Sequence, residues 1–303
     1  MQHACRDDAM IRLAVISGKG GTGKTMMTAA LAHLLTGSLV CADCDVDAAN
    51  LELLLRPKII RTEPFMGMKV AVIDPAICTQ CGECNEHCRF DAVERDGDAY
   101  RVSPLHCEGC AVCTYVCPVS AVTMQPRQTG EIMYSETNRG HLVHARLVPG
   151  AGNSGLLVHE VKKTALAHDG NCRLFLIDGP PGTGCPLIST ISGMDSVLVV
   201  TEPSVSGLHD LKRVVNVCRQ FRPRIFAAVN RFDLDESLAQ KIRVWCCEEN
   251  IPVIGMIPFD PAVIESVREG VPVTCAGTSP AAQAIQILAT NLEQEMKHND
   301  NQR

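Results

Sequence analysis

The sequence is poor in aromatic residues, which make up 4% of its 303 positions, and its formal net charge is −6. Nucleic-acid-binding proteins usually combine a basic surface with aromatic stacking platforms, so we expect no nucleic-acid partner. The chain also lacks a long apolar run: its longest uncharged stretch, 271–292, contains two prolines and many polar residues, which argues against a membrane span. The first ten residues contain no apolar signal-peptide core. We therefore expect a cytoplasmic protein without a membrane anchor.

Cysteine, by contrast, is abundant. The chain has 17 cysteines, and eight of them lie between Cys78 and Cys117. Such clustering in a long chain without an export signal points to metal binding rather than to disulfides. Hydrophobic residues make up 46% of the sequence and charged residues 20%, a balance that can support a sizeable buried core.

The order of apolar and glycine-rich segments predicts an α/β fold. A strand over 11–16 runs into SGKGGTGKT, a helix over 24–35 follows, and a second strand covers 38–42, which together form a βαβ unit with parallel strands. After a cysteine-rich interruption the alternation resumes, with strands predicted at 174–178, 196–200, 224–230 and 252–258 and helices at 207–220, 236–249 and 280–297. We expect a mostly parallel sheet flanked by helices (11–65 and 126–297), an inserted small α+β domain (66–125), an N-terminal tail (1–10) and a polar tail (298–303).

The glycine loop carries the first chemical signal. Gly18, Gly23, Lys24 and Thr25 match G-x-x-x-x-G-K-[ST] between a strand and a helix, the pattern of a loop that binds nucleotide phosphates. Gly18, Gly20 and Gly23 also spell the dinucleotide fingerprint G-x-G-x-x-G, but a dinucleotide loop has no use for the Lys-Thr pair. We therefore expect the loop, including Gly21 and Thr22, to bind ATP. Thr25 and Asp178, which ends an apolar strand, are expected to hold Mg²⁺.

Lys19, a second lysine within the loop, makes it resemble the deviant Walker A motif of the MinD/ParA class, which includes the nitrogenase iron protein and Mrp-type iron–sulfur carriers. In that class the early lysine reaches the nucleotide of a partner subunit, so the resemblance implies an ATP-dependent homodimer or a heterodimer with a related ATPase. It further implies that Asp45 in Asp43-Cys44-Asp45 lies near Mg²⁺ and the attacking water. Residues 179–184 resemble switch II of Mrp-like members, with Gly179, Pro180, Pro181 and Gly182 as its first positions. Asn230 and Pro258 match positions that face adenine.

The cysteines form two copies of C-x₂-C-x₂-C-x₃-C, which is the bacterial ferredoxin pattern for two [4Fe–4S] clusters. The two copies are an internal repeat of about 30 residues. Zinc ribbons use two C-x₂-C pairs for each ion and leave no place for the third cysteines, so they fit less well. Because the fourth cysteine ligates the other cluster in such proteins, we predict Cys78, Cys81, Cys84 and Cys117 for one cluster and Cys88, Cys107, Cys110 and Cys113 for the other.

Nearly the whole chain thus resembles MinD-superfamily P-loop ATPases with an inserted 2[4Fe–4S] ferredoxin domain. The leading hypothesis is an ATPase, slow without its partner, that gates electron transfer to a redox partner in metal-centre assembly. Catalysis would rest on Lys19, Lys24 and Asp45. The alternative is an ATP-dependent carrier that delivers a cluster to a metallocluster-acceptor protein, and a MinD/ParA-like positioning ATPase is a more remote third reading.

Overall fold

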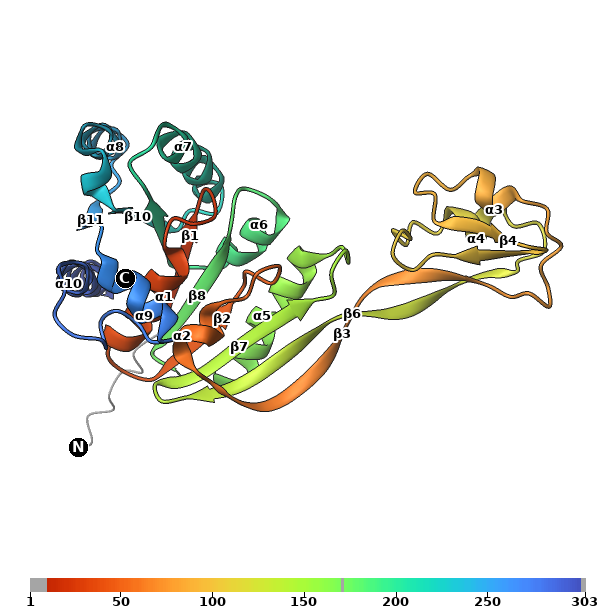
Figure 1. Ribbon diagram of the computed structural model, residues 1–303, viewed down its shortest axis with the longest axis horizontal. Coiled ribbons are helices and arrows are strands. Elements are labelled where there is room, and N and C mark those ends of the chain that lie inside the picture. The colour runs from red at the N-terminus through yellow and green to blue at the C-terminus, as the bar shows by residue number, and fades with distance from the viewer. Residues whose placement is uncertain (1–9, 170–171, 301–303) are drawn as a thin grey trace.

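The computed structural model describes residues 10–169 and 172–300, and its main body is a nine-stranded sheet with helices on both faces (Figure 1). The strand order is β11-β10-β9-β1-β8-β2-β7-β6-β3, and the pairings from β11 to β7 are all parallel. These parallel strands are β1 (Ile11–Ser17), β2 (Leu39–Asp43), β7 (Gly140–Leu147), β8 (Leu174–Pro181), β9 (Ser196–Thr201), β10 (Arg224–Asn230) and β11 (Val253–Ile257). The mostly parallel α/β sheet predicted from the sequence is confirmed.

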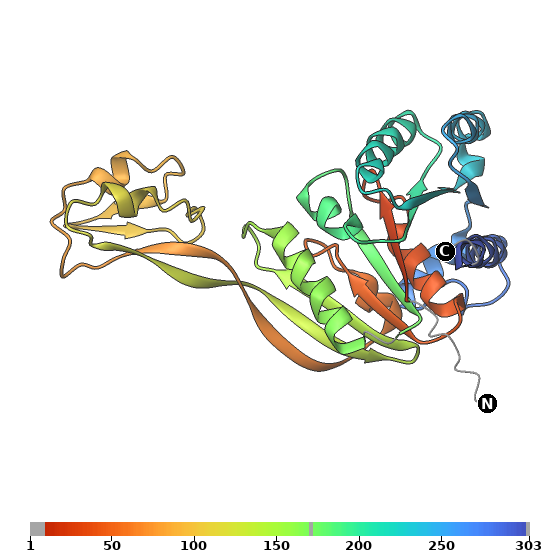
Figure 2. The ribbon, with the colours of Figure 1, turned by 180° about the vertical axis from the view of Figure 1, so that it is seen from behind.

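Helices cover each face of the sheet, because its central strands are apolar on both sides. One buried cluster joins the strands to α5 (Ser154–Asp169), α6 (Cys185–Ile191), α7 (Val205–Arg219) and α8 (Glu236–Glu248). The other joins them to α1 (Lys24–Leu34), α2 (Leu51–Leu55) and α10 (Pro280–Asp300), and α9 (Pro261–Arg268) lies near this face. Figure 2 shows the sheet from behind, with α5 and α6 in front of it. Fully buried strands of this kind are typical of parallel sheets.

The predicted strands and helices of the body match the structure within a few residues at their ends. The last helix is an exception, since α10 continues to Asp300 and so includes the start of the segment 298–303 that we predicted to be a tail. The rest of that segment and the predicted N-terminal tail, except for Met10, lie outside the described residues.

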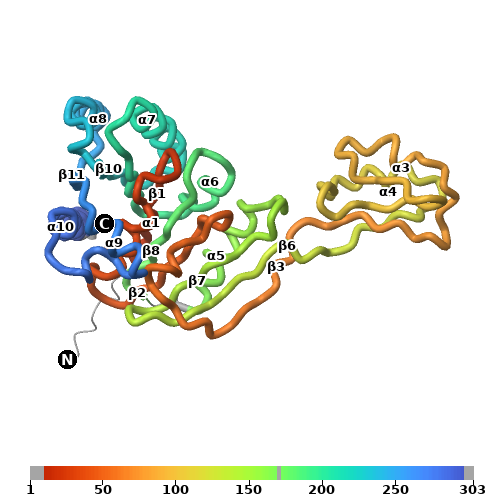
Figure 3. Tube along the Cα trace, viewed as in Figure 1, coloured from red at the N-terminus to blue at the C-terminus, as the bar shows by residue number. Residues whose placement is uncertain are grey.

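A long two-stranded arm, which we did not predict from the sequence, leaves one edge of the sheet (Figure 3). It consists of β3 (Lys58–Ile73) and β6 (Val122–Thr137), which pair antiparallel from Lys58↔Glu136 to Ile73↔Val122. β6 also pairs antiparallel with β7, so the arm is an extension of the main sheet. The predicted boundaries of the inserted domain, 66 and 125, fall inside the two arm strands.

The arm carries a small lobe at its far end, formed by the chain between β3 and β6 (Figure 1). The lobe contains α3 (Glu83–Glu86), β4 (Val93–Asp96), β5 (Ala99–Val102) and α4 (Val112–Val116), with β4 and β5 forming a two-stranded sheet and α3 packing on α4. All eight clustered cysteines belong to this lobe. No helix in the described part of the chain has the length and apolarity that crossing a membrane requires.

Candidate nucleotide site and cysteine lobe

The glycine loop follows β1 at the carboxyl edge of the sheet and leads directly into α1. Gly23 has a φ of +92° and precedes the first helical residue, and Met27 N donates to its carbonyl at 3.0 Å. A Cβ at Gly23 would lie 2.3 Å from Nδ2 of Asn230, and one at Gly18 would lie 2.5 Å from Cβ of Asp210. Glycine is therefore required at both positions, by conformation and close approach at Gly23 and by close approach at Gly18.

Lys24, Thr25 and Asp178 meet at the start of α1. The ammonium of Lys24 lies 2.9 Å from Oδ1 of Asp178, and the Thr25 hydroxyl donates to Oδ2 at 2.7 Å. Thr28, one turn further along α1, donates its hydroxyl to Oδ1 at 2.9 Å. Asp178 is fully buried and Lys24 is 6% exposed. Burial by itself would lower the pKa of Lys24, but Asp178, Asp45 and Asp43 together raise it.

Asp43 and Asp45 bring two further carboxylates to this cluster. Asp45 Oδ2 lies 3.6 Å from the Lys24 ammonium. Asp43, fully buried, accepts hydrogen bonds from the backbone N–H groups of Asp45, Asn50 and Leu51 and so fixes the loop that begins α2. Burial, assisted by Asp178, raises the pKa of Asp43, and burial likewise raises the pKa of Asp45. Three carboxylates therefore face a single ammonium. An Mg²⁺ ion bound by oxygen ligands would balance the remaining negative charge.

The cluster opens into a cavity of about 720 Å³. The glycine loop, the Asp45 loop and the two prolines of predicted switch II line it, together with apolar residues of α1, α2 and α9. Thr22 Oγ1 is buried beside it and has no hydrogen-bond partner among the described residues. An unpaired hydroxyl and a phosphate-type loop at the base of an open cavity fit a nucleotide triphosphate.

The structure does not bring every predicted nucleotide residue to this cavity. Gly18, Lys19, Asn230 and Pro258 are not among its lining residues. The Asn230 amide instead donates to the carbonyl of Thr22 at 2.8 Å and supports the loop from behind, and Pro258 follows β11. Their roles toward the partner's nucleotide and toward adenine remain predictions.

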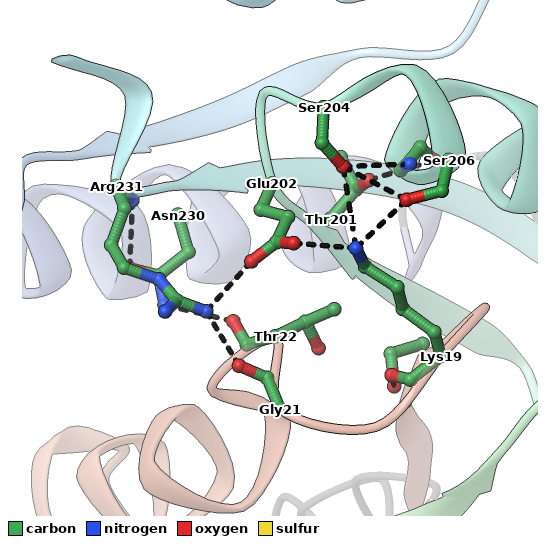
Figure 4. A network of polar contacts seen from close by, with 11 residues as sticks. Lys19, Gly21, Thr22, Thr201, Glu202, Ser204, Ser206, Asn230 and Arg231 are labelled. Carbon is green, nitrogen blue, oxygen red and sulfur yellow. Dashed lines mark hydrogen bonds and ion pairs between the residues drawn. The ribbon is translucent and has the colours of Figure 1, made fainter. Parts of the chain in front are cut away.

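Sequence reasoning missed three groups of this site. Thr28 carries a local signal, because it lies three residues after Thr25 on the same helix face. Glu202 and Arg231 follow the ends of β9 and β10, and only the sheet brings them beside the glycine loop (Figure 4).

The lobe repeats its backbone conformation as well as its cysteines. Left-handed φ values occur at Gln80 and Gly109, at Gly82 and Ala111, and at Asp91 and Ser120. Each pair is separated by 29 residues, the spacing that also separates Cys78 from Cys107. Left-handed residues are also found in the backbone nests that bind anions and iron–sulfur clusters.

Several of the clustered cysteines lie close to one another in the lobe. Four of them line one small cavity in the lobe, namely Cys88, Cys107, Cys110 and Cys113. Burial raises the pKa of Cys113 to about 11, with Cys107 and Cys110 adding to the rise, and burial and nearby Cys78 and Cys81 raise the pKa of Cys84. Cys117 Sγ accepts a hydrogen bond from the N–H of Ala121 at 3.2 Å. In the described residues no three His, Cys, Asp or Glu side chains converge as a metal site would, so the two clusters remain a prediction.

The fold and the glycine loop define an α/β P-loop NTPase. Within that class the chain belongs to the CobQ/CobB/MinD/ParA nucleotide-binding domain family, whose model matches residues 13–273. An uncharacterised protein of Methanocaldococcus jannaschii is 30% identical over 94% of this chain and 97% of its own length. An uncharacterised ATP-binding protein of the same organism is 26% identical over 93% of this chain and 87% of its own length.

Two further comparisons have a narrower scope. The Mg-ADP complex of the septum site-determining protein MinD from Pyrococcus horikoshii is 22% identical, with a TM-score of 0.58 over 95% of this chain and 98% of that one, and it supports the fold. The iron–sulfur cluster carrier protein of Pyrococcus abyssi is 27% identical, but the match covers only 42% of this chain and 48% of the carrier.

Proposed function

We propose that this protein binds and hydrolyses ATP with Mg²⁺, holds two [4Fe–4S] clusters in the lobe, and uses the nucleotide to gate electron transfer to a partner in metal-centre assembly. The observation that carries the iron–sulfur part is the 29-residue repeat of both cysteines and left-handed backbone positions. Eight thiols, four of them around one cavity, are the donor set that such clusters use. When bound, the clusters supply one-electron transfer. Cys81 and Cys110 are solvent-exposed and would present the clusters to a partner.

At the nucleotide site each residue has a role that follows from its position. Lys24 lies at the base of the cavity and would neutralise the β- and γ-phosphates, and Thr25 and Asp178 would hold Mg²⁺ directly or through water. Asp45, at the cavity wall beside Lys24, would position the attacking water. Stabilisation of the transferring phosphoryl group would come from Lys24, Mg²⁺ and, in a dimer, Lys19.

Coupling between nucleotide and clusters is supported by the contacts of α2. Asp43 caps this helix with two hydrogen bonds, and the chain passes from its end directly into the arm strand β3. Glu52 of α2 lies 3.1 Å from the ring of His144 on β7, and the other ring nitrogen lies 3.1 Å from the hydroxyl of Ser135 on β6. His144 and Ser135 are fully buried. A movement of the Asp43–Asp45 loop would therefore act on both strands of the arm.

The test is an anaerobic EPR-monitored redox titration of the reconstituted protein, without nucleotide and with MgATP. We expect two [4Fe–4S] signals and a change in potential or line shape upon MgATP addition. The change should disappear in Lys24→Met and persist in Lys163→Met, an exposed lysine on α5. Failure to bind two clusters, or spectra that ignore MgATP in the wild type, would refute gated transfer.

The second candidate is ATP-dependent delivery of a cluster, because the partial relatives from Pyrococcus abyssi and two other Pyrococcus species are named iron–sulfur cluster carriers. Mixing the loaded protein with an apo-ferredoxin separates the two functions. ATP-dependent appearance of the acceptor's cluster would favour delivery, whereas two clusters retained through many ATP turnovers would favour electron transfer.

A further inference from the structure

The loop that joins β7 to α5, residues 148–153, lies between the nucleotide site and the cysteine lobe. Figure 1 and Figure 2 both show it pointing from the body of the protein toward the lobe. A Cβ placed on Gly152 in this loop would lie 3.1 Å from Sδ of Met68 on the arm strand β3 and 3.8 Å from Oε2 of Glu108 in the lobe. Glu108 directly follows Cys107, the first cysteine of the second motif. The body of the protein therefore approaches this motif directly, as well as through the arm.

The second cysteine motif is also packed against the arm. Gly109 has a φ of +66°, and a Cβ on it would lie 2.6 Å from the carbonyl oxygen of Lys69 on β3. Lys69 follows Met68, the arm residue beside Gly152. The turn 107–110 thus lies where the arm and the β7–α5 loop meet.

The first cysteine motif, 78–88, packs within the lobe instead. Asn85 donates its side-chain amide to the carbonyl of Val93 on β4. A Cβ on Gly82 would lie 3.1 Å from the hydroxyl of Tyr100 on β5. The two halves of the repeat therefore have different surroundings, although their cysteine spacing is the same.

One end of the β7–α5 loop is bound to the loop that carries Asp45. Leu147, the last residue of β7, donates its N–H to the carbonyl of Val46 at 3.3 Å, and Val46 is buried and follows Asp45 directly. The next residue, Val148, donates its N–H to the carbonyl of Thr129 on the arm strand β6 at 2.8 Å. A movement of the Asp45 loop would therefore act on the β7–α5 loop at the point where that loop is joined to the arm.

The other end of the β7–α5 loop adjoins predicted switch II. The carbonyl of Asn153 accepts two N–H hydrogen bonds from the first turn of α5, at 3.0 and 3.1 Å. Gly155 in this turn lies so close to the start of α6 that a Cβ there would be 3.3 Å from Cβ of Cys185. Cys185 directly follows the switch II segment 179–184. Each end of the loop is thus next to a segment that is expected to respond to the nucleotide.

We infer that the β7–α5 loop positions the second cysteine motif according to the nucleotide state, so that only one of the two clusters responds to ATP. The responding cluster is the one predicted for Cys88, Cys107, Cys110 and Cys113. This inference rests on the proposed function and adds which cluster is gated. Gly152 and Glu108 are positioning residues in it. A lobe that moved only as a whole on its arm would affect both clusters alike.

Hydrogen exchange measured by mass spectrometry on the reconstituted, anaerobic full chain tests this inference without an assay of electron transfer. A non-hydrolysable ATP analogue with Mg²⁺ should change the amide exchange rates of residues 107–111 by about 5-fold or more, the lower end of ordinary allosteric coupling. Residues 78–82, the equivalent segment of the first motif, should be unchanged and are the internal control. Residues 20–25 of the glycine loop report binding of the analogue in the same spectra.

The glycine loop separates the two ways in which this experiment can fail. A protected glycine loop with an unchanged second motif, or with equal changes in both motifs, would overturn the inference and leave ATP binding intact. A glycine loop that the analogue does not protect would overturn the proposed function together with the inference.

Two variants interrupt the contact between the loop and the lobe. Gly152→Leu adds a side chain where Met68 and Glu108 now lie, and Glu108→Thr introduces the residue that the first motif has at the equivalent position, Thr79. Glu86→Thr, which replaces an exposed glutamate of the first motif, is the matched control. The change in exchange at 107–111 should be lost in the first two variants and kept in the control.

The same variants should affect the redox titration followed by EPR. In the wild type and in Glu86→Thr, MgATP should shift the potential of one cluster signal by about 40 mV or more, which corresponds to a 5-fold preference for one redox state. The shift should be lost in Gly152→Leu and Glu108→Thr. Cys110→Ser should alter or remove the responding signal, and Cys81→Ser the other one. A shift that persists in both contact variants, or that belongs to the signal altered by Cys81→Ser, contradicts the role of the loop.

Discussion

Replacing Lys24 with methionine tests the electrostatic reading of the nucleotide site most directly. The substitution keeps most of the side-chain volume but removes the only described cation within 4 Å of the carboxylates of Asp178 and Asp45, at 2.9 and 3.6 Å. Two unit charges about 4 Å apart are worth about 4 kcal/mol at an effective dielectric constant of about 20. Removing one partner of a buried pair costs about 3–5 kcal/mol in proteins.

Two features of the site reduce this cost. The cavity admits water to the carboxylate of Asp45, and the raised pKa values of Asp43 and Asp45 allow them to take up protons. We therefore expect the free energy of unfolding to fall by about 2–4 kcal/mol at pH 7. The pKa of Lys24 is raised, so its stabilising charge is fully present below its ordinary value of 10.5 and therefore at pH 7. The loss should be larger above pH 8 than at pH 7, because Asp43, whose folded-state pKa is about 8, becomes protonated as the pH falls through that value.

Urea unfolding followed by Trp245 measures this change. Trp245 is the only tryptophan in the sequence and lies on α8 of the sheet domain, so its fluorescence reports this domain and not the lobe. ATP turnover, measured as phosphate release, should fall by about 10²- to 10³-fold. Lys163→Met removes an exposed lysine paired with Glu160 and should change stability by less than about 0.5 kcal/mol. Wild-type turnover, or an unchanged free energy of unfolding at pH 7, would refute the roles assigned to Lys24.

Three further predictions concern neighbouring features. Gly23→Ala places a side chain at a φ of +92° and against the Asn230 amide. We expect the free energy of unfolding, measured by urea titration, to fall by about 1–3 kcal/mol. Gly97→Ala is the control for the backbone conformation alone, because Gly97 has a φ of +62° and faces open space. Asp178→Asn should weaken nucleotide binding at least 10-fold in calorimetry with Mg²⁺ and far less in EDTA; equal losses in both would contradict its metal role. Lys162 donates to three carbonyls at the end of α6, and burial lowers its pKa to about 8. Between about pH 8 and 10 the Lys162 side chain is neutral in the folded protein but still protonated in the unfolded chain, so the wild type should gain stability relative to Lys162→Met as the pH rises through this range. Thermal melts of the two proteins measure this, and a difference in melting temperature that does not change with pH would contradict it.

Local sequence patterns were sufficient to predict those parts of the structure that a few neighbouring residues determine. The phosphate loop depends on glycine conformations and on the start of α1, and residues 18–25 determine both. The parallel strands are short apolar runs because both their faces are buried, so their positions could be predicted within a few residues. The repeat in the lobe was visible because its cysteine spacing is local to each copy.

The arm could not be predicted because its strands carry no simple period. β3 begins with seven exposed residues, contains Pro64, and its pairing with β6 shifts register at several points. Such a segment is a strand only because β6 lies beside it, and β6 begins some fifty residues further along the chain. The end of α10 differed for a related reason, since helix ends depend on packing and capping as much as on composition.

The sequence by itself therefore determined the class of nucleotide loop, the alternation of the sheet and the cysteine repeat, because these follow from backbone conformation and spacing within short segments. The tertiary structure decided which distant groups meet. Asp43, Asp45 and Asp178 share Lys24 because β2 and β8 are neighbours, and Glu202 faces both Lys19 and Arg231 because β9 lies between β1 and β10. Charges that are far apart in the chain interact strongly only where the sheet brings them within a few ångströms and removes most of the water between them.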